Sequence, residues 1–266
     1  MNLLSTLYSD SGKYKLHLHE LIHALAENET KKYKQLSIMA EPDRARVATT
    51  VVFQGPKRRM DLVYHVSSDD TDTAEEVVLE CQGYLTRMQM PPITSRNQLP
   101  TKPHLAQQSV TIAGMGCDSF AVFSKAINAI TTVFERHATA AKTVTGLDVS
   151  STGTLSFSNR YFTQHDEVDD LTPIPFSQQI DPLGFLASVA EGIHTADNNV
   201  QYFEKIDGSN KILYRKIGPE DIYPGLLVQI QCSFSAVPIG LKCYRVIAKL
   251  RSICILDRIV EKVSWW

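Results

Sequence analysis

The residues of this chain that could do chemistry most directly are His19, Glu20 and His23, which form an H-E-x-x-H motif. Residues four positions apart lie on one face of a helix, so two histidines at this spacing can hold one Zn²⁺. The glutamate between them can act as the general base toward a metal-bound water. The motif therefore indicates a zinc-dependent, peptidase-like hydrolase with Zn²⁺ as its cofactor.

A zinc site of this kind needs a third protein ligand, and the sequence places none at the usual spacing. Where the extended motif has glycine and histidine, this chain has Ala26 and Glu29. A more distant carboxylate, on Glu75, Glu76 or Glu80, would be an alternative third ligand. The competing interpretation is an exposed helix with solvated His and Glu side chains, which needs no cofactor.

A second set of candidate residues lies in the last quarter of the chain. Residues 200–266 carry ten basic residues against six acidic ones, whereas residues 164–199 carry seven acidic residues and no Lys or Arg. Cations interleaved with tyrosines are typical of proteins that bind single-stranded nucleic acid, because cations contact phosphates and rings stack on nucleobases. The competing interpretation is Lys and Arg that keep strand edges soluble and unpaired. The predicted contacts with single-stranded DNA or RNA are Tyr202, Tyr214, Arg215, Lys242, Tyr244, Arg245, Lys249 and Arg251.

Two shorter patterns are weaker candidates. The segment 114–118 (GMGCD) precedes a predicted helix and would present N–H groups to an anion, but it lacks the later glycine or the Lys-Ser/Thr of a phosphate loop. The alternative is a tight strand-to-helix turn. His194 and Asp197 could orient a catalytic imidazole, and the alternative is a hydrogen bond within a loop.

Composition restricts the classes of protein further. The chain has 266 residues, a net charge of -2 and no apolar run of membrane-spanning length, and its first residues do not form a secretory signal pattern. Its five cysteines include no C-x-x-C pair, which argues against a zinc finger and favours a reducing compartment. These features predict an intracellular protein of the nucleus or cytoplasm with no membrane partner.

Hydrophobic periodicity predicts an α+β fold in which a mixed N-terminal sheet is packed by one long helix. The expected helices cover residues 14–28 and 119–141, and Asp181-Pro182 begins a short helix that Gly192 ends. Residues 89–107 and 164–180 are expected to be loops, because prolines interrupt them. The expected strands cover residues 47–54, 59–66, 76–82, 108–113 and 154–163.

The remainder of the sequence indicates strands throughout. VQYFEKI and KILYRKI flank Asp207-Gly208, a hairpin signal, and strands follow at 226–237, 241–250 and 252–260. Five consecutive short strands predict a small antiparallel sheet or a barrel like that of oligonucleotide-binding folds. We therefore divide the chain into a mixed part, 1–165, and a β-rich part, 166–266; the alternative is one continuous domain.

Residues 181–257 contain three short patterns that occur together. They are an Asp-Pro-x-Gly helix start, an Ile-His-x-x-Asp-Asn stretch before a Tyr-bearing strand, and Leu-Arg-Ser-Ile in a long strand. The positions are Asp181, Pro182, Gly184, Ile193, His194, Asp197, Asn198, Val200, Tyr202, Leu250, Arg251, Ser252 and Ile253. This region resembles a family of uncharacterised proteins from mushroom-forming (basidiomycete) fungi. Where that family has Gly-Asp, this chain has Gly225-Leu226.

The resemblance implies no particular activity, but the transposon-rich genomes of such fungi imply a link to mobile elements. With the basic, Tyr-bearing C-terminal strands it favours a non-enzymatic interaction module that binds single-stranded nucleic acid and has no cofactor. The alternative is the zinc hydrolase built on the H-E-x-x-H motif. A lectin-like or toxin-like β-module is a third possibility, because sugar sites leave no reliable short motif.

Overall fold

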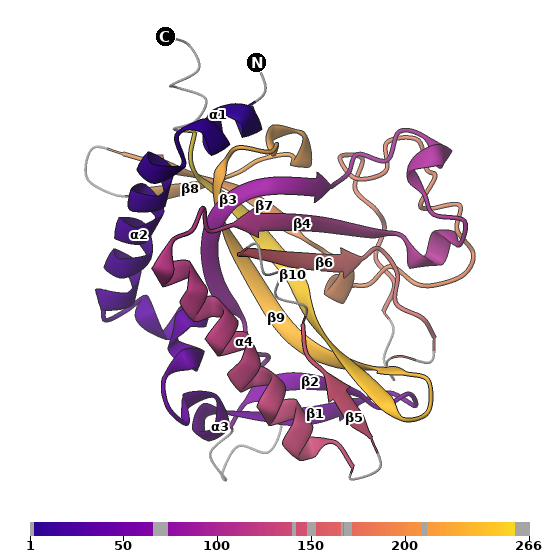
Figure 1. Ribbon diagram of the computed structural model, residues 1–266. Helices are drawn as coiled ribbons and strands as arrows, with labels where there is room; N and C mark the ends of the chain where they lie inside the picture. Colours follow the sequence, from indigo (N-terminus) through magenta and orange to yellow (C-terminus); the bar gives the residue numbers. More distant parts are fainter. Residues whose placement is uncertain are drawn as a thin grey trace.

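The computed structural model describes residues 3–65, 74–139, 142–147, 153–165, 167, 172–208 and 212–258 (Figure 1). Its α-helices are α1 (Leu3–Ser9), α2 (Ser11–Glu27), α3 (Arg44–Ala48) and α4 (Asp118–His137). Its strands are β1 (Thr49–Gln54), β2 (Arg59–Tyr64), β3 (Leu79–Gln89), β4 (Gln107–Ala113), β5 (Thr143–Thr145), β6 (Thr154–Arg160), β7 (Gln201–Asp207), β8 (Ile212–Lys216), β9 (Leu227–Ile239) and β10 (Cys243–Asp257). Its 3₁₀ helices are η1 (Lys32–Lys34), η2 (Leu36–Ala40), η3 (Arg96–Gln98), η4 (Pro103–Leu105), η5 (Ala196–Asn198) and η6 (Pro219–Asp221).

The ten described strands form one mixed sheet, which confirms the α+β class. Its order is β1-β2-β9-β3-β4-β6-β10-β7-β8, with β5 on β10 and a further pairing between β9 and β10. The sheet folds back on itself because β9 pairs with both β3 and β10, but β6 and β10 meet through one residue pair, Ser158 and Lys249. The closed barrel predicted for the C-terminal strands is therefore not confirmed.

The longest hairpin of the sheet is formed by β9 and β10, drawn in yellow tones in Figure 1. The sequence predicted two strands, 241–250 and 252–260, where the structure has the single strand β10. The pairing register shifts between Leu250 and Ser252, so Arg251 lies in a β-bulge. A bulge keeps a strand continuous while bending it, whereas in the sequence the polar Arg-Ser pair looks like a break.

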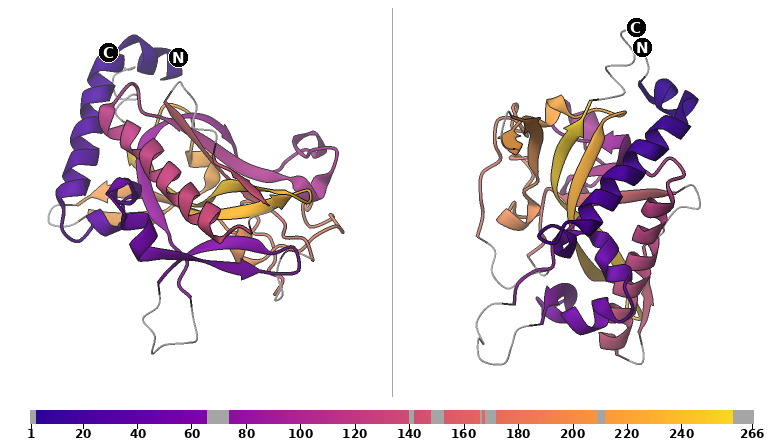
Figure 2. Two further views of the ribbon diagram at one scale, coloured as in Figure 1. Left: turned by 60° about the horizontal axis from the view of Figure 1, so that its bottom comes forward. Right: turned by 90° about the vertical axis from the view of Figure 1, so that its left-hand side faces the viewer.

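Helix α4 packs its apolar face on one face of the sheet, and α2 lies beside it (Figure 2). The predicted three- and four-residue spacing of Phe120, Phe123, Ile127 and Phe134 places all four side chains in the core. Gly83 on β3 allows this close approach, because a Cβ there would lie 3.1 Å from the Phe120 ring. The long packing helix is therefore confirmed.

The short helix predicted after Asp181 is wrong. The segment forms turns, in which Asp181 Oδ2 accepts a hydrogen bond from the Ala187 N–H at 2.8 Å and Gly184 has φ +72°. Because Gly184 adopts the left-handed conformation, the helical turn that begins at Asp181-Pro182 does not continue. The segment instead closes a second small core around Phe162 and Leu186.

Strands from both predicted parts of the chain interleave in the sheet. Strand β9, from 166–266, lies between β2 and β3, from 1–165, and it bonds to both. The two parts therefore share one sheet and one main core, which is the continuous arrangement that the sequence also allowed. No helix in the described part of the chain is long and apolar enough to cross a membrane.

Candidate binding groove

A row of polar side chains crosses the face of the sheet that points away from α4. On β9, Val228, Ile230 and Cys232 are buried in the core, and Gln229 and Gln231 between them point to the opposite face. The register places Gln82 of β3 beside Gln229, and Glu80 beside Gln231. Ser252 of β10 lies across from Gln231 on the other side. Strand alternation thus collects amides and a carboxylate on one face.

This row forms the floor of a groove of about 630 Å³. Helix α2 forms one wall through Leu21 and Leu25, and the β7–β8 hairpin forms the opposite wall through Phe203 and Tyr214. Tyr214 and Lys205 are cross-strand neighbours, so both point into the groove. The volume is within the range of sites that bury a small ligand or one unit of a polymer.

The floor is held by hydrogen bonds between its own side chains. Glu80 Oε1 accepts from Gln231 Nε2 at 3.0 Å, and Glu80 Oε2 accepts from Gln35 Nε2 at 3.1 Å. Gln82 Nε2 donates to Gln35 Oε1 at 2.9 Å and to Gln229 Oε1 at 3.1 Å. Buried amides bonded in this way have fixed orientations, so the groups that remain exposed in the groove are preorganised for a ligand.

Three lysines line the groove, Lys31 and Lys34 from the loop after α2 and Lys205 from β7. In the described chain, no carboxylate forms an ion pair with Lys31 or Lys34. Glu80 and Asp257 also line the groove, so the lysines leave it with a net positive charge. The lysines can contact phosphate groups, and the aromatic wall can stack on a planar ring. The amides of the floor can hydrogen-bond to the polar edge of that ring.

Two of the tyrosines predicted to stack on nucleobases are buried. Tyr202 is 4% exposed, and its hydroxyl donates a 2.5 Å hydrogen bond to Gln108 Oε1. Burial raises its pKa well above the ordinary value for tyrosine. Tyr244 is 2% exposed and lies beneath Lys142. The prediction that these two rings form exposed platforms is wrong, because the core face of each strand contains them.

Two of the predicted cations belong to a buried charge cluster. Lys249 Nζ lies 2.6 Å from Asp197 Oδ2, and Arg251 Nη1 lies 2.7 Å from Asp197 Oδ1. Arg251 also pairs with Glu76, and Arg59 lies 3.5 Å from Asp197. The acidic segment 164–199 thus neutralises these cations, and they cannot face a polyanion as predicted.

The cations of the charge cluster determine the pKa of the Asp197 carboxyl. Burial alone would raise the pKa of Asp197, but Lys249, Arg251 and Arg59 outweigh it and hold that pKa well below the ordinary value. Burial lowers the pKa of Lys249 although Asp197 opposes the change. The cluster ties η5 to β10 and β2 and contributes to structure.

The other predicted contacts are separated from one another. Arg215 pairs with Glu204 at 2.5 Å, while Lys242 and Arg245 lie at the tip of the β9–β10 hairpin. Arg245 is about 23 Å from Ser252 along the strand, at roughly 3.3 Å per residue. Of the eight predicted contacts, Tyr214 is the one that lines the groove.

The H-E-x-x-H residues do not assemble a metal site. His19, Glu20 and His23 are exposed on α2, and the described residues include no group of three or more potential metal ligands. His19 Nδ1 lies 2.7 Å from Ser119 Oγ, whereas His23 Nδ1 lies 3.3 Å from Glu27. The two imidazoles therefore have separate partners, and the described residues bring no third potential ligand to them.

The residues of the groove floor were not predicted from the sequence. The stretch LLVQIQCSFS on β9 alternates apolar core residues with Gln229, Gln231 and Ser233. This alternation is the signal that could have found them, because such a strand has one face in the core and one polar face. Gln35 joins Glu80 at the floor because their two segments pair with each other, and no local sequence pattern indicates that pairing.

Comparison with known proteins gives no relative from which a function could be transferred. No protein-family model matches the chain, no curated protein matches it, and no solved structure matches it.

Proposed function

We propose that the protein is an interaction module that takes a segment of single-stranded nucleic acid into the groove between α2 and β7–β8. The observation that carries the proposal is the placement of Lys31, Lys34 and Lys205 around an amide floor, with an aromatic wall opposite α2. Phosphates would contact the lysines and a base would stack on Tyr214. The edge of the base would hydrogen-bond to the glutamine amides, which carry both donors and acceptors.

The chemistry of the groove favours this ligand over a lipid or a neutral sugar. A lipid tail could not use the hydrogen-bonding capacity that Gln229 and Gln231 retain beyond their bonds to Gln82, Glu80 and Ser252, and burying it in an apolar complex is costly. A neutral sugar would gain little from three lysines. With a nucleic-acid ligand the protein would act in the nucleus or cytoplasm. The resemblance of residues 181–257 to a fungal family and an association with mobile elements remain predictions.

Fluorescence anisotropy with labelled single strands of about 12 nucleotides, as DNA and as RNA, tests the proposal. Binding should weaken steeply between about 50 and about 200 mM salt. The double substitution K31E/K34E should lower the affinity about tenfold or more and reduce the salt slope by about two. Tyr214→Ala should weaken binding, while Tyr214→Phe should retain it, because the phenyl ring can still stack.

The matched control is K242E/R245E, which reverses two exposed charges at the far tip of the β9–β10 hairpin. Its affinity should change much less than that of K31E/K34E. Absence of binding at low salt would contradict the proposal as a whole. Binding that K242E/R245E weakens as strongly as K31E/K34E would contradict the groove as the site.

A further inference from the structure

Two sequence patterns that are far apart in the chain, the H-E-x-x-H motif and the GMGCD segment, meet at the start of α4. Ser119 Oγ lies 2.7 Å from His19 Nδ1, so the first histidine of the H-E-x-x-H motif contacts the residue that follows the GMGCD segment. In the imidazole tautomer with its proton on Nε2, Nδ1 accepts the hydrogen bond from the serine hydroxyl. This is the relation between a nucleophile and its general base.

The backbone before Ser119 has the form of a sharp strand-to-helix turn. Strand β4 ends at Ala113, α4 begins at Asp118, and between them Met115 and Gly116 have φ values of +52° and +75°. The left-handed region is strained for methionine, and such strain concentrates at functional sites. Hydrolases place a nucleophilic serine at a strained strand–turn–helix connection, and Ser119 lies in the first turn of the helix that follows this connection.

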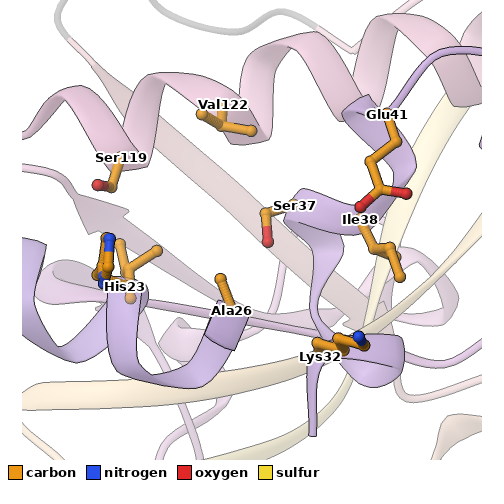
Figure 3. A pocket seen from close by; sticks show the side chains of 9 residues that line it. His23, Ala26, Lys32, Ser37, Ile38, Glu41, Ser119 and Val122 are labelled. Carbon is orange, nitrogen blue, oxygen red and sulfur yellow. The ribbon is translucent and has the colours of Figure 1, made fainter. Parts of the chain in front are cut away.

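A cavity of about 250 Å³ opens beside this serine (Figure 3). Ser119 lies at one end of the cavity above His23, and Val122 lies further along α4. Ile22 and Ile38 add apolar surface to the lining, and Lys32, Ser37 and Glu41 add polar groups. The space therefore suits a short acyl group attached to a carbonyl at the serine.

The first turn of α4 can stabilise negative charge on that carbonyl oxygen. The N–H groups at the start of a helix have no intrahelical acceptor. The Phe120 N–H bonds to the Cys117 carbonyl at 3.1 Å, which leaves the N–H groups of Asp118 and Ser119 at the turn. Backbone donors at a helix start, where the helix dipole is positive, are suited to a developing oxyanion.

We propose that Ser119 and His19 form a catalytic dyad that hydrolyses small carboxylic esters in this cavity. Ser119 Oγ bonds to the ester carbonyl carbon while His19 Nδ1 takes the hydroxyl proton. The C–O bond to the alcohol then breaks, and the alcohol leaves with that proton. Water, deprotonated by His19, next attacks the acyl-serine, which releases the carboxylic acid and restores Ser119.

This activity is separate from nucleic-acid binding and requires no metal. The groove is lined by His17, Leu21 and Leu25 of α2, whereas the cavity is lined by His23 and Ala26 of the same helix. Either proposal can therefore fail without the other.

A fluorophosphonate probe, which forms a covalent bond with activated serines, tests the dyad on the full chain. Mass spectrometry should find the probe on Ser119 in the wild type and none on S119A. The substitution H19Q should slow labelling by about 100-fold or more, because the general base is lost. Release of nitrophenol from nitrophenyl acetate should continue beyond one equivalent per protein, and a metal chelator should change neither result.

A second hydroxyl–imidazole contact supplies the matched control. Thr50 Oγ1 lies 3.4 Å from His137 Nε2 at the other end of α4, and neither residue lines the cavity. T50A should therefore leave labelling and nitrophenol release unchanged. If S119A fails to fold, S119C provides a second test. The thiol of S119C should react faster with iodoacetamide when His19 is present than it does in S119C/H19Q. An unlabelled wild type, or labelling at the wild-type rate in H19Q, would overturn the proposal.

Discussion

At the residue scale, what covers each face of β10 decides which of its side chains can meet a ligand. Tyr244 and Val246 alternate with Arg245 and share one face of the strand. Tyr244 and Val246 are buried, because that face belongs to the core. On the opposite face, Lys249 is covered by the segment that carries Asp197. Burial from distant segments cannot be derived from alternation.

The charge cluster gives the first prediction at this scale. Asp197→Asn removes the charge shared by buried Lys249 and half-buried Arg59 and Arg251, and should lower the free energy of unfolding by about 2–4 kcal/mol. Urea denaturation of the wild type and the variant measures the difference. The control is Asp43→Asn, because the Asp43–Arg46 ion pair is exposed and should contribute far less. Equal effects of the two substitutions would contradict a structural role for the cluster.

The environment of His194 gives the second prediction. Its ring stacks on Phe176 with centroids 3.9 Å apart, and its Nδ1 donates to the Tyr161 carbonyl at 2.8 Å. Burial lowers the pKa of His194, although the bond to Tyr161 opposes this change. The neutral ring is therefore favoured in the folded state. Its contribution to stability is present above the unfolded-state pKa of about 6.5 and is lost as the pH falls through the lower folded-state pKa.

The free energy of unfolding should consequently decrease as the pH falls below about 6.5. His194→Asn keeps a neutral donor for the Tyr161 carbonyl and should remove part of this pH dependence, although it is less stable at neutral pH. Gly12→Ala provides the control, because it changes no titratable group and should leave the slope unchanged. A slope that His194→Asn does not reduce would show that another group causes it.

At the element scale, the structure confirms elements with a complete local signal and corrects those that depend on distant contacts. The apolar spacing of α4 and the Asp-Gly turn of the β7–β8 hairpin are local, and both were predicted. The position of β9 between β2 and β3 is not local, since Asp61 pairs with Ser235 across most of the chain. The same holds for the groove, whose lining joins α2 to the five strands β3, β7, β8, β9 and β10.

The turn between β4 and α4 gives the prediction at this scale. A Cβ at position 114 would overlap the Phe120 ring, so Gly114→Ala should lower the free energy of unfolding by about 1–3 kcal/mol. Gly12, on α2, has open space around the position of a Cβ. Gly12→Ala should therefore leave stability unchanged or raise it by up to about 1 kcal/mol. Thermal melts compare the two, and equal losses would contradict the role of close packing at the turn.

At the scale of the whole molecule, the interleaved sheet predicts that the chain folds as a unit. Strand β9 bonds to β2, β3 and β10, so neither 1–165 nor 166–266 contains all the neighbours of its own strands. Separating the two parts would expose the core face of β9 together with its unpaired backbone groups, which is energetically costly. We therefore expect that residues 1–165 and 166–266 are not independently stable domains.

The full chain should consequently unfold in a single transition. Far-ultraviolet circular dichroism and calorimetry should give the same midpoint. The fragments 1–165 and 166–266, expressed separately, should lack cooperative unfolding transitions, whereas mixing them could restore one by pairing β9 with β2 and β3. A circular-dichroism transition in isolated 166–266 like that of the full chain would contradict this prediction. It would mean that the C-terminal strands form an independent domain, with contacts to β2 and β3 that add little to its stability.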